Sequence, residues 1–221
     1  MLNLLFPKHC NGCKKTLTTN EKVLCTQCIH DLPLACHHRT NSQAMKQVFF
    51  GRFPVENATA LLQFQKRGIT QELLHNLKYR GQQEIGVFFG KWLGAEIAEL
   101  EHYQSIDMVI PVPLHKQKLK KRGYNQVAGF GKEIALALNK PYRDEVLLKI
   151  SKTSSQVFKQ RLTRFSAPQI FTVQNPGLIK QKHILLVDDI VTTGATLENC
   201  ALQLRDGTDA KISLATIAIA L

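Results

Sequence analysis

The sequence lacks any apolar run of the ~18 residues that a membrane-spanning helix requires, and it has no internal repeat or low-complexity tract. Its opening carries no charged segment ahead of the short apolar run, so a secretory signal is not expected. These absences exclude membrane-inserted and repeat proteins. A hydrophobic content of 44% is enough for a packed core, which excludes a disordered chain or a fibre. We therefore expect a cytoplasmic globular protein.

Acidic residues are scarce: 17 Asp and Glu stand against 29 Lys and Arg, which gives a formal net charge of +12. The excess is concentrated, because residues 107–165 contain 13 Lys or Arg and 4 Asp or Glu, a net +9. Clustered positive charge attracts nucleic acids and anionic small substrates. A solvated basic face explains the same composition, and charge alone does not separate the two interpretations.

Four of the six cysteines form two Cys-x-x-Cys pairs separated by eleven residues: Cys10, Cys13, Cys25 and Cys28. Two residues between thiolates let one turn present both sulfurs to an ion, and two such turns complete the tetrahedral shell of zinc. We predict a structural zinc knuckle over 1–39, which is too small to bury a core without metal. Two disulfides are the alternative, which a cytoplasmic location disfavours. Spacing assigns no role to the nearby His9, His30, Cys36, His37 and His38.

Residues 48–221 are predicted to form a larger α/β domain. Helical apolar spacing occurs at 71–77, 84–100, 125–138 and 197–204. Short apolar runs typical of buried strands occur at 107–112, 146–150, 184–187 and 212–219. Fully apolar strands that alternate with helices indicate a parallel sheet covered on both faces. The basic segment 151–168 has little periodicity and is long for a connection, which favours a functional loop.

The most informative segment is an apolar strand that ends in Asp188 and Asp189 and is followed by a Thr- and Gly-rich loop and a helix. In open α/β sheets, ligands bind beyond the carboxyl ends of the strands. The loop can direct backbone N–H groups and hydroxyls at a phosphate, and the acids suit sugar hydroxyls with Mg²⁺ nearby. A Mg²⁺-binding receiver domain and a structural Asp N-cap are the alternatives, and each explains only part of the segment.

This segment resembles the phosphoribosyl pyrophosphate (PRPP) signature of type I phosphoribosyltransferases. Three further motifs accompany it: the two cysteine pairs, Leu77–Gly81, and Asp107–His115 with the following Lys121–Gln126. The four motifs together resemble the ComF family, whose members combine an N-terminal zinc knuckle with a phosphoribosyltransferase fold and are linked to DNA uptake in natural competence. The resemblance implies a type I phosphoribosyltransferase-like parallel sheet flanked by helices, behind a small zinc knuckle.

The resemblance also implies site residues. Asp188 and Asp189 contact the ribose hydroxyls of PRPP, which binds with Mg²⁺. The loop around the 5′-phosphate consists of Thr192, Thr193, Gly194, Ala195 and Thr196. The loop that faces pyrophosphate consists of Val112, Pro113, Leu114 and His115. Segment 151–168 is the hood that closes over bound PRPP, with Lys152, Gln156 and Arg164 as candidate contacts.

The basic run from His115 to Arg122 has three interpretations: it contacts a nucleic-acid backbone, it holds pyrophosphate beside the PRPP site, or it is solvated. The candidate nucleic-acid residues are Lys116, Lys118, Lys120, Lys121, Arg122 and Tyr124. Tyr124 offers a ring on which a base can stack, and it suits packing at the start of a helix equally well.

Two functions are left open. We predict a PRPP-binding protein that acts in DNA uptake and handles incoming single-stranded DNA, with a competence helicase as a further candidate partner. The alternative is a Mg²⁺-dependent phosphoribosyltransferase that acts on an unidentified small acceptor and does not bind DNA. The sequence identifies no catalytic residue for that transfer.

Overall fold

The computed structural model describes residues 7–40, 43–150 and 170–220. The predicted hood, with Lys152, Gln156 and Arg164, lies outside these described residues. Within them, no helix is both long enough and apolar enough to cross a membrane.

The central sheet has four parallel strands in the order β1-β6-β5-β2. Their bounds are β1 (Ala58–Gln63), β2 (Met108–Pro111), β5 (His183–Val191) and β6 (Lys211–Ile219). The predicted parallel sheet is confirmed. The strand expected at 146–150 forms instead β3 (Leu147–Lys149), which pairs antiparallel with β4 (Phe171–Val173) in a separate two-stranded sheet.

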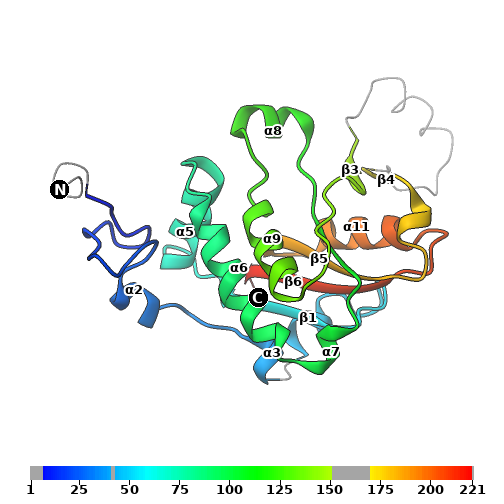
Figure 1. Ribbon diagram of the computed structural model, residues 1–221, viewed down its shortest axis with the longest axis horizontal. Coiled ribbons are helices and arrows are strands. Elements are labelled where there is room, and N and C mark those ends of the chain that lie inside the picture. Colours follow the sequence, from blue (N-terminus) through cyan, green and yellow to red (C-terminus); the bar gives the residue numbers. More distant parts are fainter. Residues whose placement is uncertain (1–6, 41–42, 151–169, 221) are drawn as a thin grey trace.

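Helices cover both faces of the parallel sheet (Figure 1). One face packs against α5 (Ile69–Tyr79), α6 (Glu84–Ala98) and α9 (Ala128–Ala137), and the other packs against α11 (Ala195–Arg205). The shorter helices are α2 (Thr26–His30), α3 (His37–Thr40), α4 (Ala44–Gln47), α7 (Glu101–Gln104), α8 (Lys116–Arg122) and η1 (Pro176–Leu178).

From Ile184 to Val187 the side chains of β5 alternate between the two layers. Leu185 and Val187 belong to the core under α5, α6 and α9, whereas Ile184 and Leu186 belong to the core under α11. Successive residues of a strand point to opposite faces. The acids that follow in the same strand therefore leave the sheet on opposite sides, Asp188 toward α11 and Asp189 toward α5.

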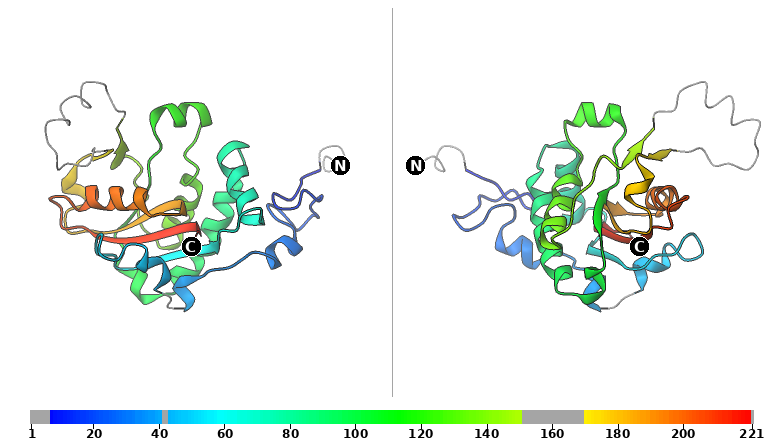
Figure 2. Two further views of the ribbon diagram at one scale, coloured as in Figure 1. Left: turned by 180° about the vertical axis from the view of Figure 1, so that it is seen from behind. Right: turned by 45° about the vertical axis from the view of Figure 1, so that its right-hand side comes forward.

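The cysteine-containing segment packs against the outer end of α5 and α6. The side chain of Asn76 in α5 donates a hydrogen bond to the Asn11 carbonyl (3.0 Å), and Lys14 forms an ion pair with Glu72 (2.7 Å). In Figures 1 and 2 this segment lies at one end of the molecule, while α8 and the paired strands β3 and β4 both project from one long edge of it. That edge carries the candidate site.

Candidate functional site

The carboxyl ends of β2 and β5 lie side by side at this edge. Pro111 is paired with Val187, and the Val112 N–H donates to the Val187 carbonyl (2.9 Å). The side chain of Asn125 donates to the Val112 carbonyl (3.1 Å) and so fixes the start of the loop after β2. The structure therefore brings the predicted pyrophosphate loop next to the acid pair.

Both acids of the pair are buried, with exposed fractions of 8% for Asp188 and 3% for Asp189. Asp188 accepts a hydrogen bond from the Asp189 N–H (2.8 Å), and burial together with the Asp189 carboxylate raises the pKa of Asp188. Asp189 Oδ1 lies 3.0 Å from Lys78 Nζ, but its buried Oδ2 has no hydrogen-bond partner among the described residues. A buried carboxylate oxygen without a donor is costly, which favours a role in binding a hydroxyl or a cation.

The predicted phosphate loop follows directly. Gly194 adopts a φ of 77°, a left-handed conformation that favours glycine, and it caps the N-terminus of α11. A Cβ at this position would lie only 2.8 Å from Cε1 of Phe49. Glycine is therefore required both by the backbone conformation and by the close approach of this ring. Thr192, Thr193, Ala195 and Thr196 are exposed around it, at the positive end of an eleven-residue helix.

Two cations at this edge received no role from the sequence. Lys78 lies within a motif, Leu77–Gly81, but nothing local indicated its contact with Asp189. Arg52 donates from Nη1 to the Thr193 carbonyl (2.7 Å) and lies 3.2 Å from the carboxylate of Glu198. No sequence signal pointed to Arg52, because its partners lie far away along the chain.

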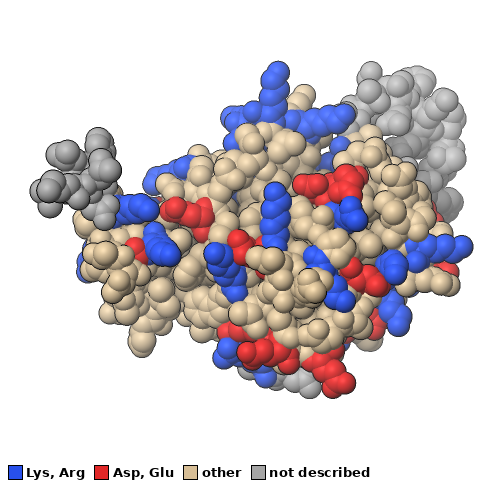
Figure 3. All heavy atoms as spheres, viewed as in Figure 1, with Lys and Arg blue, Asp and Glu red and all other residues tan. Residues whose placement is uncertain are grey.

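The basic run forms α8, a helix without a buried residue that projects from the candidate edge. It ends at Gly123, which has a φ of 82°. Basic side chains gather over it in Figure 3. Its four lysines are exposed and form no ion pair with any described residue: Lys116, Lys118, Lys120 and Lys121. The helix therefore presents positive charge that no described acid pairs with, at the edge of the molecule that carries the acid pair.

The other two nucleic-acid candidates make internal contacts. The guanidinium of Arg122 lies 5.5 Å from the centre of the Tyr79 ring and donates to the side chain of Gln126. The hydroxyl of Tyr124 donates to the Leu77 carbonyl. Between α5 and α8 there is a cavity of about 360 Å³, lined by Lys78, Tyr79, Gly81, Lys118, Lys121, Arg122 and Tyr124. It shares Lys78 with the acid pair and thus adjoins the candidate site.

The four predicted metal ligands lie together. The sulfurs of Cys10, Cys13, Cys25 and Cys28 are all within 4.8 Å of one another. Cys13 and Cys25 are 3.6 Å apart at sulfur, well beyond the ~2.05 Å of a disulfide. Burial raises the pKa of the Cys10 thiol, but hydrogen bonds from backbone N–H groups, including that of Cys25, lower it by more. The net effect is a lowered pKa of about 7. This cluster could hold a zinc ion.

A second cluster, Cys36, His38 and Glu96, brings possible ligand atoms equally close. Its polar groups already have protein partners: His38 and Glu96 bond to each other, and the Cys36 thiol lies 3.9 Å from the Leu61 carbonyl. His38 Nε2 lies 2.6 Å from Glu96, its Nδ1 lies 2.7 Å from the Thr59 hydroxyl, and the indole of Trp92 donates to Glu96 (2.7 Å). This set is a hydrogen-bond network that ties α3 to α6 and β1.

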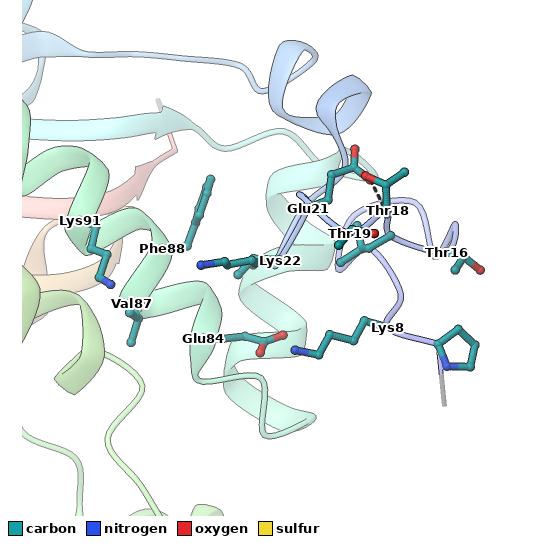
Figure 4. A pocket seen from close by; sticks show the side chains of 13 residues that line it. Lys8, Thr16, Thr18, Thr19, Glu21, Lys22, Glu84, Val87, Phe88 and Lys91 are labelled. Carbon is teal, nitrogen blue, oxygen red and sulfur yellow. Dashed lines mark hydrogen bonds between the residues drawn. The ribbon is translucent and has the colours of Figure 1, made fainter. Parts of the chain in front are cut away.

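A cavity of about 450 Å³ separates the cysteine segment from α6. Figure 4 shows Lys8 and Lys22 entering it from the cysteine segment, opposite Glu84 and Phe88 of α6. The residues that line it include none of the acid pair, the Thr/Gly loop or α8. It is therefore separate from the candidate site.

Comparison with known proteins places this geometry in a family. Residues 128–219 match the phosphoribosyl transferase domain family. The chain is 26% identical over 203 residues to the DNA utilization protein YhgH of Escherichia coli, covering 90% of this chain and 85% of that protein. It is 29% identical over 199 residues to the competence protein ComFC of Streptococcus pneumoniae, covering 86% and 71%. Adenine phosphoribosyltransferase from Leishmania donovani is similar with a TM-score of 0.38 and 15% identity, covering 80% of each chain. The matched domain and these two relatives support a ComF-family protein with a type I phosphoribosyltransferase fold and a close cluster of four N-terminal cysteines.

Proposed function

We propose that this protein binds PRPP together with Mg²⁺ where β2 and β5 end, and that it acts in the uptake and handling of DNA. The observation that carries PRPP binding is the buried carboxylate oxygen of Asp189, which has no hydrogen-bond partner in the described part of the chain, together with the nearby loop that Gly194 opens. A sugar hydroxyl is the donor that this oxygen lacks, and a phosphate is the ligand that the loop suits. The DNA role is supported by the names of the relatives, one a competence protein and one a DNA utilization protein.

In this proposal, Asp188 and Asp189 accept hydrogen bonds from the ribose hydroxyls. The backbone N–H groups and hydroxyls of the Thr192–Thr196 loop hold the 5′-phosphate. The Val112–His115 loop and Lys78 face the pyrophosphate group. Mg²⁺ bound together with PRPP would neutralise part of the phosphate charge and so would allow the ligand to approach two carboxylates. In the cysteine segment, Cys10, Cys13, Cys25 and Cys28 would hold a structural zinc ion, because four thiolates close its tetrahedral shell.

Transfer of the ribosyl group to a small acceptor is the second candidate function. The cavity of about 360 Å³ favours it, because it adjoins the acid pair through Lys78 and has two tyrosines in its lining. Its cations, including Lys118 and Lys121, suit an anionic group, and its tyrosine rings suit a planar one. Release of pyrophosphate from PRPP when candidate acceptors are added would support transfer, whereas binding without release would favour the first proposal.

Thermal unfolding tests the proposed PRPP site. A ligand that binds only the folded protein stabilises it by about 2.7 kcal/mol at a concentration one hundred times its Kd. We expect the unfolding midpoint to rise with PRPP and Mg²⁺, and to rise much less with either one alone. An unchanged midpoint at millimolar PRPP with Mg²⁺ would count against the site.

Single-stranded DNA is proposed to contact the exposed lysines of α8. Replacing Lys118 and Lys121 by glutamate should weaken binding of an oligothymidylate at least about tenfold. It should also make the slope of log affinity against log salt concentration less steep by about 1.4, since each phosphate contact contributes ~0.7 for single strands. The matched control replaces Lys180 and Lys211, which are exposed where β5 and β6 begin, at the opposite edge of the sheet. Equal loss in both double variants would mean that net charge, and not α8, governs binding.

A further inference from the structure

We infer that Arg52 is a positioning residue that sets the phosphate loop in its binding geometry; the inference rests on the proposed PRPP site. Arg52 Nη1 donates to the Thr193 carbonyl at 2.7 Å, a short hydrogen bond from a charged donor. The same Nη1 lies 3.2 Å from the Glu198 carboxylate in the first turn of α11, which holds the guanidinium in place. Arg52 therefore bridges the loop and the helix that follows it.

The hydrogen bond from Arg52 also fixes the orientation of the peptide unit that joins Thr193 and Gly194. The Thr193 carbonyl and the Gly194 N–H belong to the same planar trans peptide, so they point in opposite directions. An arginine that fixes the carbonyl on one side fixes the N–H on the other. Within the described chain, the Gly194 N–H donates no hydrogen bond to protein. Arg52 thus holds a free backbone donor in one direction at the start of α11, where an anion binds.

The packing around Gly194 keeps this peptide from turning. A Cβ on Gly194 would lie 2.8 Å from Cε1 of Phe49 and 3.0 Å from Cγ1 of Val48, so both side chains already touch the glycine. Phe49 and Arg52 belong to one tight turn, in which the Arg52 N–H donates to the Phe49 carbonyl (3.0 Å). Residues 48–52 therefore support the phosphate loop as a unit, although Arg52 and Thr193 lie 141 residues apart in the sequence.

We expect removal of the Arg52 guanidinium to weaken only the binding of ligands that carry the 5′-phosphate group. Replacing Arg52 by methionine keeps most of the aliphatic stem and removes the guanidinium. We expect R52M to bind ribose 5-phosphate about tenfold more weakly than the wild type in calorimetric titrations. Binding of Mg²⁺–pyrophosphate, which does not use this loop, should stay unchanged. Unchanged ribose 5-phosphate binding in R52M would overturn the assignment.

Two further variants separate positioning from charge and from general stability. R52K keeps the positive charge, but the lysine side chain ends one bond short of the Nη1 position from which arginine reaches both Thr193 and Glu198, so we expect an intermediate loss of about threefold. R205M removes an arginine at the other end of α11, where Nε donates to the Ala210 carbonyl (3.3 Å), and should bind like the wild type. Should R52M not fold, wild-type affinity in R52K would overturn the assignment.

Nuclear magnetic resonance gives a direct readout of the proposed donor. Adding ribose 5-phosphate should shift the backbone amide signal of Gly194 in the wild type, and this shift should shrink in R52M. A Gly194 signal that does not respond in a wild type that binds would overturn the assignment while leaving the proposed function intact. A folded wild type that binds neither ribose 5-phosphate nor PRPP would overturn both.

Discussion

Replacing both Asp188 and Asp189 by alanine is expected to weaken Mg²⁺-dependent PRPP binding at least about a hundredfold, since each substitution removes hydrogen bonds from a charged acceptor. The two carboxylates lie at the end of β5 between the Val112–His115 loop and the Thr192–Thr196 loop. No other described acid is as deeply buried as this pair.

The same double substitution should not destabilise the fold. Burial and the adjacent Asp189 carboxylate raise the pKa of Asp188, so an ionised Asp188 is unfavourable in the free protein. Because folding raises the pKa of this carboxyl, the folded protein loses stability as the pH rises above the pKa that the group has in the unfolded state. Removing the carboxyl relieves that cost at neutral pH. We expect an unfolding midpoint equal to or above that of the wild type, together with lost PRPP binding.

A matched control replaces Glu99 and Glu101, two exposed acids around the start of α7. It removes the same charge and should leave PRPP binding unchanged. A double Asp variant that binds PRPP as well as the wild type would contradict the proposed site. If the double Asp variant does not fold, the same titration is made with the isosteric Asp189→Asn variant. For that variant we still expect PRPP affinity to fall at least about tenfold.

Loss of zinc is expected to unfold the cysteine segment and leave the α/β domain intact. The segment has little core of its own, and structural zinc contributes an apparent ~10–16 kcal/mol of binding free energy in comparable small sites. The Cys25→Ser variant should carry no zinc, whereas the wild type should carry one ion per chain. Trypsin should then cleave rapidly after Lys14, Lys15 and Lys22, all exposed in this segment.

The matched control is Cys36→Ser, because Cys36 lies outside the four-sulfur set. It should retain one zinc and resist trypsin at these sites. Mg²⁺–PRPP binding should survive in both variants, because the segment contacts α5 and α6 rather than the Asp188–Asp189 edge. A wild type without zinc whose cysteines are paired in disulfides would contradict the prediction.

The sequence predicted the parts of the fold that depend on local pattern. The continuous apolar runs of β5 and β6 indicated a parallel sheet, and the acids after the apolar run indicated the site edge. Helix α8 was not predicted, because its run has no apolar periodicity. Lysine and arginine are nevertheless good helix formers, and Gly123 supplies the left-handed residue that ends the helix.

The contacts that complete the site could not be predicted, because they join distant segments. Strand β1, with its Ala- and Leu-rich sequence, acquires its conformation by pairing with β6. Lys78 reaches Asp189 only when α5 packs on the sheet, and Arg52 reaches Thr193 from the turn after α4. Neither partner is marked by a local motif that includes the other.

Calorimetric titration of the zinc-loaded protein with PRPP and Mg²⁺ tests the central claim most directly. The account predicts one PRPP bound per chain, with binding that depends on Mg²⁺ and disappears when Asp188 and Asp189 are replaced by alanine. Absence of binding to the folded, zinc-loaded wild type would contradict it, and the basic helix α8 would then become the leading candidate for the functional surface.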